Sequence, residues 1–308
     1  MGTRITQNAM SYNYLRNLNK SLTKQDQLNK QLSDGKLIHK PSDDPIGTIR
    51  SMTFGSNLSK NEQYQQNLGD AQSWMNTTDG VMSQYSDIMI RIKELTLSAA
   101  NGDKPQDAVQ VIGDEVDNLL NQMVALGNTK IADRYVFAGQ KDKTQPFVRD
   151  DKTGEVSYLG DNNKISMVIN TDASAKAAQD SINLTGPEVF GGDGTQLMNQ
   201  LNEIKNRLKS GTKEDQDWLS QVGLGYIEEG HNNILQSHTE LGTRMTTYTM
   251  MESVLEENNT TISTDLSANE DADMAKLIMN FKVSEAGYKA ALSVGSQVLP
   301  LSLVDFLK

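Results

Sequence analysis

Residues 81–99, VMSQYSDIMIRIKELTLSA, indicate the fold most directly. Apolar side chains recur in this stretch at alternating intervals of four and three residues, with no polar interruption. They are Val81, Tyr85, Ile88, Ile92, Leu95 and Ala99. This spacing places them on one face of an α-helix, and it is typical of a seam that packs lengthwise against other helices. The stretch therefore predicts a long helix inside a bundle.

Two further stretches repeat this pattern. Residues 109–126 carry apolar side chains at Val109, Ile112, Val116, Leu119, Met123 and Leu126. Residues 234–266 continue it at Ile234, His238, Leu241, Met245, Tyr248, Glu252, Leu255, Asn259, Ile262 and Leu266. We interpret His238 as a hydrogen-bonded residue that fixes the register of the seam. Helix interiors exclude proline, and residues 46–104 and 188–299 contain none. The sequence thus predicts a mainly α protein, a bundle of long antiparallel helices.

The two ends of the chain carry weaker seams. The first runs through Leu15, Leu18, Leu22, Gln25, Asn29 and Leu32, and the last through Met274, Ile278, Phe281, Glu285, Tyr288 and Leu292. Residues 1–40 have a net charge of +5, whereas residues 265–308 have a net charge of −2. Amphipathic segments of opposite charge attract each other, so we expect the two terminal arms to pair.

The middle of the chain changes character. Gly- and Asp-rich turn signals at 150–154 and 160–163 flank short β-type runs. We therefore expect a small β-containing insert at 141–194, lying outside the helical seams as a surface module. The predicted domains are the terminal arms, 1–44 with 266–308, disordered in the monomer; the helical bundle, 45–140 with 195–265; and the insert, 141–194.

Composition argues against several classes of function. The 308 residues include no cysteine and only three histidines, so a thiol nucleophile is excluded and imidazole chemistry has little material. The net charge of −11 disfavours nucleic-acid binding. No apolar run reaches the ~18 residues that a membrane helix requires. We predict no enzyme activity, no catalytic residue, no cofactor, no metal and no membrane insertion.

The acidic pairs are better explained as helix caps than as cation sites. Asp44 precedes Pro45, which suits the first position of a helix, so Asp44 is the expected N-cap. The same reasoning makes Asp271 the expected N-cap of the helix that starts near Met274. His231 and His238 lie seven residues apart without a third ligand at a clear spacing, so a structural role is favoured over metal binding.

Several motifs together resemble a known family. They are 32–36, LSDGK; 39–45, HKPSDDP; 133–139, DRYVFAG; 271–275, DADMA; and 299–307, LPLSLVDFL. They are similar to the signatures of the hook–filament junction proteins of the bacterial flagellum, a family within the flagellin superfamily. Arg4-Ile5-Thr6 resembles the opening of that family, although Gly2-Thr3 precede it as an extra pair.

The resemblance implies a structural subunit that joins hook to filament through coaxial packing of its terminal helices. Implied partners are the first hook-associated protein, flagellin, a type III export chaperone and further copies in a ring. The implied location is the extracellular flagellum, reached by type III export. Flagellin itself, or a cytosolic coiled-coil signalling or adaptor protein, remains the alternative. The expected assembly residues are Arg4, Ile5, Leu15, Leu18, Leu22, Leu32, Pro41, Ser42, Asp43, Asp44, Pro45, Met274, Ile278, Phe281, Tyr288, Leu292, Leu299, Leu301, Leu303 and Phe306.

Overall fold

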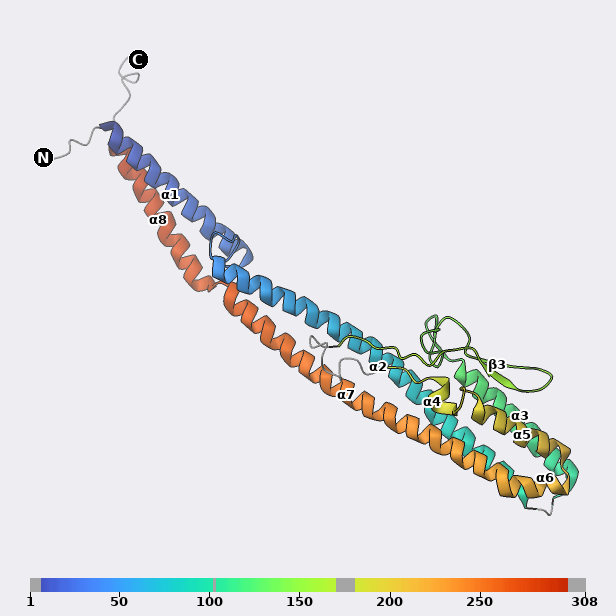
Figure 1. The fold of residues 1–308 in the computed structure, drawn as a ribbon. Coiled ribbons are helices and arrows are strands. Elements are labelled where there is room, and N and C mark those ends of the chain that lie inside the picture. The colour runs from blue at the N-terminus through green and yellow to red at the C-terminus, as the bar shows by residue number, and fades with distance from the viewer. Residues whose placement is uncertain (1–6, 102–103, 170–180, 299–308) are drawn as a thin grey trace. The chain divides into compact units, whose positions relative to one another are not determined.

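A computed structural model describes residues 7–101, 104–169 and 181–298, and long helices dominate it (Figure 1). The helices are α1 Gln7–Asp34, α2 Pro45–Ala100, α3 Gln106–Gly127, α4 Gly186–Phe190, α5 Gln196–Ser210, α6 Lys213–Trp218, a π-helical turn Leu219–Gly223, α7 Leu224–Glu270 and α8 Met274–Val298. The strands are β1 Lys130–Ile131, β2 Arg134–Tyr135, β3 Phe147–Arg149 and β4 Val156–Tyr158. They form two antiparallel pairs, β1–β2 and β3–β4. The predicted fold class, mainly α with a small β component, is confirmed.

The contacts divide the chain into two units. The terminal unit comprises residues 1–60 and 258–308, and the central unit comprises residues 61–257. Both α2 and α7 contribute residues to each unit. The expected division into arms, bundle and insert stays a prediction. None of the described helices is both long and apolar enough to cross a membrane.

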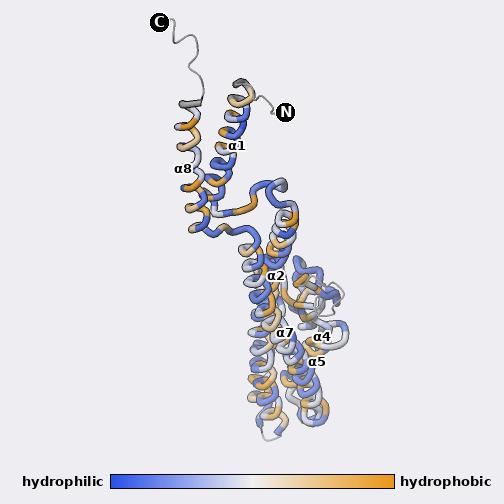
Figure 2. Tube along the Cα trace, turned by 90° about the vertical axis from the view of Figure 1, so that its left-hand side faces the viewer, coloured by the Kyte–Doolittle hydropathy of each residue, from blue (hydrophilic) through white to orange (hydrophobic). Residues whose placement is uncertain are grey.

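The core of the central unit forms along the predicted seams. All six apolar positions of the seam at 81–99 are buried. On α3, Val109, Ile112, Val116 and Met123 are buried as predicted, whereas Leu120 rather than Leu119 completes the buried face. Because α3 packs against α5, its buried face meets apolar residues of α5 such as Leu201 and Leu208. Figure 2 shows the hydrophobic residues recurring at intervals along α2, α5 and α7.

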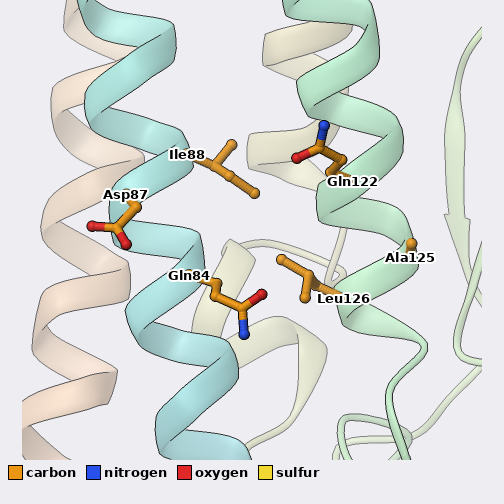
Figure 3. A pocket seen from close by; sticks show the side chains of 6 residues that line it. All are labelled: Gln84, Asp87, Ile88, Gln122, Ala125 and Leu126. Atoms are coloured by element: carbon orange, nitrogen blue, oxygen red, sulfur yellow. The ribbon is translucent and has the colours of Figure 1, made fainter.

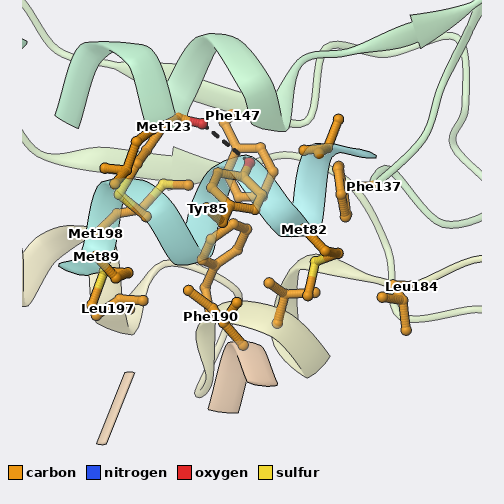
Figure 4. Close-up of a cluster of buried hydrophobic side chains, with 14 of the residues drawn as sticks. Met82, Tyr85, Met89, Met123, Phe137, Phe147, Leu184, Phe190, Leu197 and Met198 are labelled. Atoms are coloured by element: carbon orange, nitrogen blue, oxygen red, sulfur yellow. Dashed lines mark hydrogen bonds between the residues drawn. The ribbon is translucent and has the colours of Figure 1, made fainter. Parts of the chain in front are cut away.

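An aromatic cluster joins the segment 141–194 to this core (Figure 4). Tyr85 of α2 lies edge-on to Phe190, with ring centroids 5.1 Å apart, and Phe147 of β3 lies edge-on to Phe190 at 5.3 Å. The Tyr85 hydroxyl donates to the Met123 carbonyl oxygen at 3.1 Å, and burial raises the pKa of this phenol well above its usual value. These residues belong to one hydrophobic cluster. Aromatic side chains of the segment 141–194 are therefore buried in the core, which strand spacing alone does not reveal. Its role as a separate module stays a prediction.

Polar pairs connect α2 and α7 at regular intervals. The pairs are Gln72–Glu252, Asp79–His238, Ser86–His231 and Lys93–Glu228, with donor–acceptor distances of 2.7–3.0 Å. We call them the polar ladder. Their α2 members are spaced seven residues apart, which keeps them on one edge of the helix. The hydrogen bond of His238 to Asp79, at 2.7 Å, confirms the expectation that His238 is a hydrogen-bonded seam residue.

Candidate assembly interface

The terminal unit is built on the pairing of α1 with α8, which lie side by side (Figures 1 and 2). The Tyr14 hydroxyl donates to the Ala291 carbonyl oxygen at 2.8 Å. One turn further along α8, a Cβ atom added to Gly295 would collide with the Tyr14 hydroxyl. The absence of a side chain at Gly295 therefore allows the tyrosine to cross close to the α8 backbone. The expected pairing of the terminal segments is present.

The contact between α1 and α8 contains few buried apolar side chains. In the described part of the terminal unit, only Leu28 and Leu277 among the apolar residues are buried. Of the predicted seam, Leu18, Leu32, Phe281 and Tyr288 are half-buried, whereas Leu15, Leu22, Met274, Ile278 and Leu292 are exposed. The α1 face that meets α8 is offset from the predicted one. Sequence reasoning missed Leu28 and Leu277, although Tyr14, Leu18, Gln25 and Leu28 also follow helical spacing.

Many apolar side chains of this unit consequently face solvent. They are Met10, Tyr12, Leu15, Leu22, Leu37, Ile46, Ile49, Met52, Met274, Ile278, Met279, Val283, Leu292 and Val294. We call this set the exposed apolar surface. It holds fourteen of the twenty-three large apolar side chains that are exposed among the described residues, and Met52 reaches 71% exposure. Exposed apolar surface of this extent is typical of a protein–protein interface.

Two loops hold the α1–α8 pair to the adjoining ends of α2 and α7. Residues 35–44 connect α1 to α2, and residues 271–273 connect α7 to α8; we call them the elbow loops. The backbone N–H of Leu37 donates to the Glu270 carbonyl oxygen at 2.7 Å, and that of Ala272 donates to the Gly35 carbonyl oxygen at 2.8 Å. The Ala272–Gly35 hydrogen bond thus joins the two elbow loops directly, and the Leu37–Glu270 hydrogen bond joins the 35–44 loop to the last residue of α7.

Charged groups reinforce this connection. The Lys36 ammonium lies 2.7 Å from the Glu270 carboxylate. Their hydrogen bond lowers the pKa of Glu270 and raises the pKa of Lys36. The backbone N–H of Lys36 donates to the Asp34 carboxylate and, together with the His39 side chain, lowers the pKa of Asp34. This arrangement favours ionised carboxylates at neutral pH.

The acidic motif acts as a helix cap. The Asp44 carboxylate accepts from the backbone N–H groups of Ile46 and Gly47 at 3.1 and 3.0 Å, and Pro45 is the first residue of α2. The predicted cap is therefore confirmed. Asp43 closes the preceding turn by accepting from the N–H groups of His39 and Lys40. Pro41 and Ser42 are exposed in the same loop.

The predicted cap at Asp271 is wrong. Asp273 lies directly before Met274, the first residue of α8. Its carboxylate accepts a hydrogen bond from the Lys276 backbone N–H at 3.1 Å and so caps the helix. Asp271 instead pairs with Ser267 and bridges the backbone of Lys36. The difference arises because α8 begins at Met274, which leaves the capping position to the residue immediately before it.

Six of the expected assembly residues lie outside the described residues. They are Arg4, Ile5, Leu299, Leu301, Leu303 and Phe306.

A metal centre is absent from the described residues. They contain no group of three His, Asp or Glu side chains placed to hold a metal ion. A hollow of about 360 Å³ lies between α2 and α3, lined by Gln84, Asp87, Ile88, Gln122, Ala125 and Leu126 (Figure 3). Ile88 and Leu126 point toward each other across it. Its lining offers one carboxylate, amides and aliphatic groups, which is not a nucleophile–base arrangement.

The chain is similar to known proteins in both sequence and fold. Residues 5–142 match the family described as the bacterial flagellin N-terminal helical region. The chain is 24% identical over 299 residues to flagellar hook-associated protein 3 of Escherichia coli K12, covering 90% of this chain and 91% of that protein. The chain is similar to flagellar hook-associated protein 3 over about nine tenths of its length, and its N-terminal side is similar to the flagellin-type helical region.

One further protein and one solved structure are also similar to this chain. Flagellin 1 of Proteus mirabilis is 27% identical to this chain, over 60% of the chain and 47% of the flagellin. A solved structure described as a putative flagellar hook-associated protein from Vibrio parahaemolyticus superposes with a TM-score of 0.66. It is 19% identical and covers 74% of this chain and all of the solved one. That likeness establishes the fold.

Proposed function

We propose that this chain is a structural subunit of the bacterial flagellum that joins hook to filament. The terminal helices α1 and α8 would pack coaxially against those of neighbouring axial subunits. The observation that carries the proposal is the exposed apolar surface on a unit with only two buried apolar side chains in its described part. Because apolar burial drives association, neighbouring subunits that cover this surface would stabilise the unit.

The extent of each match favours a junction subunit over flagellin itself. The match to hook-associated protein 3 of E. coli spans about nine tenths of both chains, whereas that to Flagellin 1 of P. mirabilis spans less than half of the flagellin. A cytosolic coiled-coil adaptor is disfavoured, because the central unit contains β-hairpins packed into the helical core.

The expected partners follow from the same surface. We infer contacts with the first hook-associated protein on one side and flagellin on the other, with further copies completing a ring. An export chaperone would cover the apolar residues before assembly, since exposed apolar helices aggregate. The assembly role of the predicted residues, including Ile278 and Leu292, belongs to this proposal, as does a non-enzymatic function on the outside of the cell.

Deletion of the gene tests the proposal. Loss of swimming, with intact hooks and with flagellin released into the medium, is the expected phenotype. Complementation with Ile278→Ser should fail to restore filaments, because the substitution places a polar group within the exposed apolar surface. Val111→Ser is the matched control, since Val111 is also an exposed aliphatic side chain, at 66% against 50% for Ile278, but lies on α3 of the central unit. Full-length filaments in the deletion strain would overturn the proposed role.

A further inference from the structure

The methionines of this chain differ in exposure between the two units. Five methionines of the central unit lie at 0% exposure in its core, and Figure 4 labels four of them beside Tyr85 and Phe190. The five are Met75, Met82, Met89, Met123 and Met198. In the terminal unit, by contrast, all four described methionines belong to the exposed apolar surface. They are Met52 at 71% exposure, Met279 at 60%, Met10 at 47% and Met274 at 43%.

Hydrogen peroxide discriminates between these two groups. A lone pair of the thioether sulfur attacks one peroxide oxygen, so that an S–O bond forms while the O–O bond breaks. The departing hydroxide takes the proton of the transferred oxygen and leaves as water, so the sulfur is oxidised to a sulfoxide and the peroxide is reduced. The reaction requires contact with solvent. Met52 and Met279 have that contact in the folded chain, whereas the buried methionines react only when the core opens.

Both exposed methionines lie within apolar patches. Ile49, one turn before Met52 on α2, is 66% exposed. On α8, Met279 follows Ile278 and precedes Val283 by one turn, and both of these neighbours are exposed. Oxidation converts a flexible apolar side chain into a polar one, so it places an S–O dipole within each patch. A partner that covers the patch must then bury this dipole, which weakens binding unless a donor meets it.

We propose that Met52 and Met279 are modification sites for hydrogen peroxide, and that their oxidation to sulfoxide blocks assembly while the central unit stays folded. The assembly effect rests on the proposed flagellar role. Neighbouring subunits would cover both side chains, so the free subunit is the sensitive form and the assembled subunit is protected. Because methionine sulfoxide reductases restore the thioether, the modification is reversible.

Peptide mapping by mass spectrometry tests the selectivity on the purified full chain in dilute peroxide. Met52 and Met279 should oxidise at similar rates. Met75 and Met82 should oxidise at least about 100-fold more slowly, because the reaction there waits for the core to open. Met250, at 68% exposure in the central unit, is the internal standard for an exposed methionine and should match Met52.

Tryptophan fluorescence reports whether the central unit stays folded. Trp74 and Trp218 are the two tryptophans of the chain, and both lie in that unit. After oxidation of the exposed methionines, the thermal midpoint measured by fluorescence should shift by less than about 2 °C, as expected for changes at surface positions.

Complementation of the deletion strain tests the effect on assembly. Met52→Gln/Met279→Gln carries a polar oxygen near each sulfoxide position and should reduce the number of filaments per cell about tenfold or more. Met250→Gln is the matched control and should restore wild-type numbers. Met52→Leu/Met279→Leu stays apolar but has no sulfur to oxidise. When the gene is induced in sublethal peroxide, cells with this leucine variant should build filaments, whereas cells with the wild-type chain should build few.

Three results would overturn the proposal. They are normal filament numbers with the glutamine variant, equal sensitivity of the wild type and the leucine variant to peroxide, and oxidation of Met75 as fast as that of Met52. A different result bears on the flagellar role itself. If the wild-type gene fails to restore filaments without peroxide, that role is refuted and the assembly effect with it, whereas peptide mapping still decides the selectivity of oxidation.

Discussion

Asp44 and His231 show how single side chains stabilise long helices. The Asp44 carboxylate satisfies two backbone N–H groups that the first turn of α2 leaves without helical partners. The His231 Nε2 meets the Ser86 hydroxyl at 3.0 Å across the α2–α7 pair. Neither residue lies in a catalytic setting, and each contributes to stability in a way that substitution can measure.

Loss of the cap should weaken the start of α2. Asp44→Ala should lower the free energy of unfolding of that helix end by about 1 kcal/mol, the usual effect of losing an N-cap carboxylate. Amide hydrogen exchange at Ile46 and Gly47 reports it. Asp70→Ala, at an exposed position within α2, is the control and should leave those amides unchanged. Equal exchange in both variants would argue against the cap.

His231 should make stability depend on pH. Burial, with a smaller effect of Lys93, lowers the pKa of His231 in the folded state. The unfolded chain therefore binds the proton more readily, so the free energy of unfolding falls as pH drops below about 6.5, the ordinary histidine value. His231→Gln should reduce this fall in urea titrations between pH 7 and 5. Asn232→Gln, at the exposed neighbour, should retain it, and identical slopes for both variants would contradict the assignment.

At the scale of elements, the β3–β4 hairpin is part of the core. Phe147→Ala should lower the free energy of unfolding by roughly 3–5 kcal/mol, because it opens a cavity beside Phe190. Val148→Ala is a matched control on the same strand, since Val148 is 41% exposed and should change stability by less than about 0.5 kcal/mol. Chemical denaturation measures both. A change of less than about 1 kcal/mol in the free energy of unfolding for Phe147→Ala would contradict the packing of the hairpin in the core.

The long helices were predictable, but the partners of their faces were not. An uninterrupted apolar seam such as that at 81–99 permits only one buried face, so the sequence predicts it correctly. The terminal helices offer two faces of similar hydropathy, and the choice between Leu22 and Leu28 depends on which neighbour each face meets. The ion pairs of Arg149 and Lys209 with Asp117 could not be predicted either, because the three residues lie on three separate elements.

At the scale of the whole molecule, the two units should differ in local stability. The 28 residues of α1 and the 25 of α8 lose conformational entropy on folding, and Leu28 and Leu277 are the only buried apolar side chains among those that the structure describes in these helices. In a verified monomer, amides of both helices should exchange orders of magnitude faster than those at 81–99 of α2. Incorporation into flagella should protect them. Slow exchange of α1 and α8 in the monomer would contradict folding coupled to assembly.

The hydrogen bonds between the elbow loops have a mechanical consequence. A rotating flagellum transmits torque, and in the proposed role the subunit would be pulled and twisted through its terminal helices. Tension on α8 reaches the 271–273 loop, where the Ala272–Gly35 and Leu37–Glu270 hydrogen bonds carry part of it across to the loop that begins α2. A load applied to α8 would thereby be shared between α7 and the loop that precedes α2.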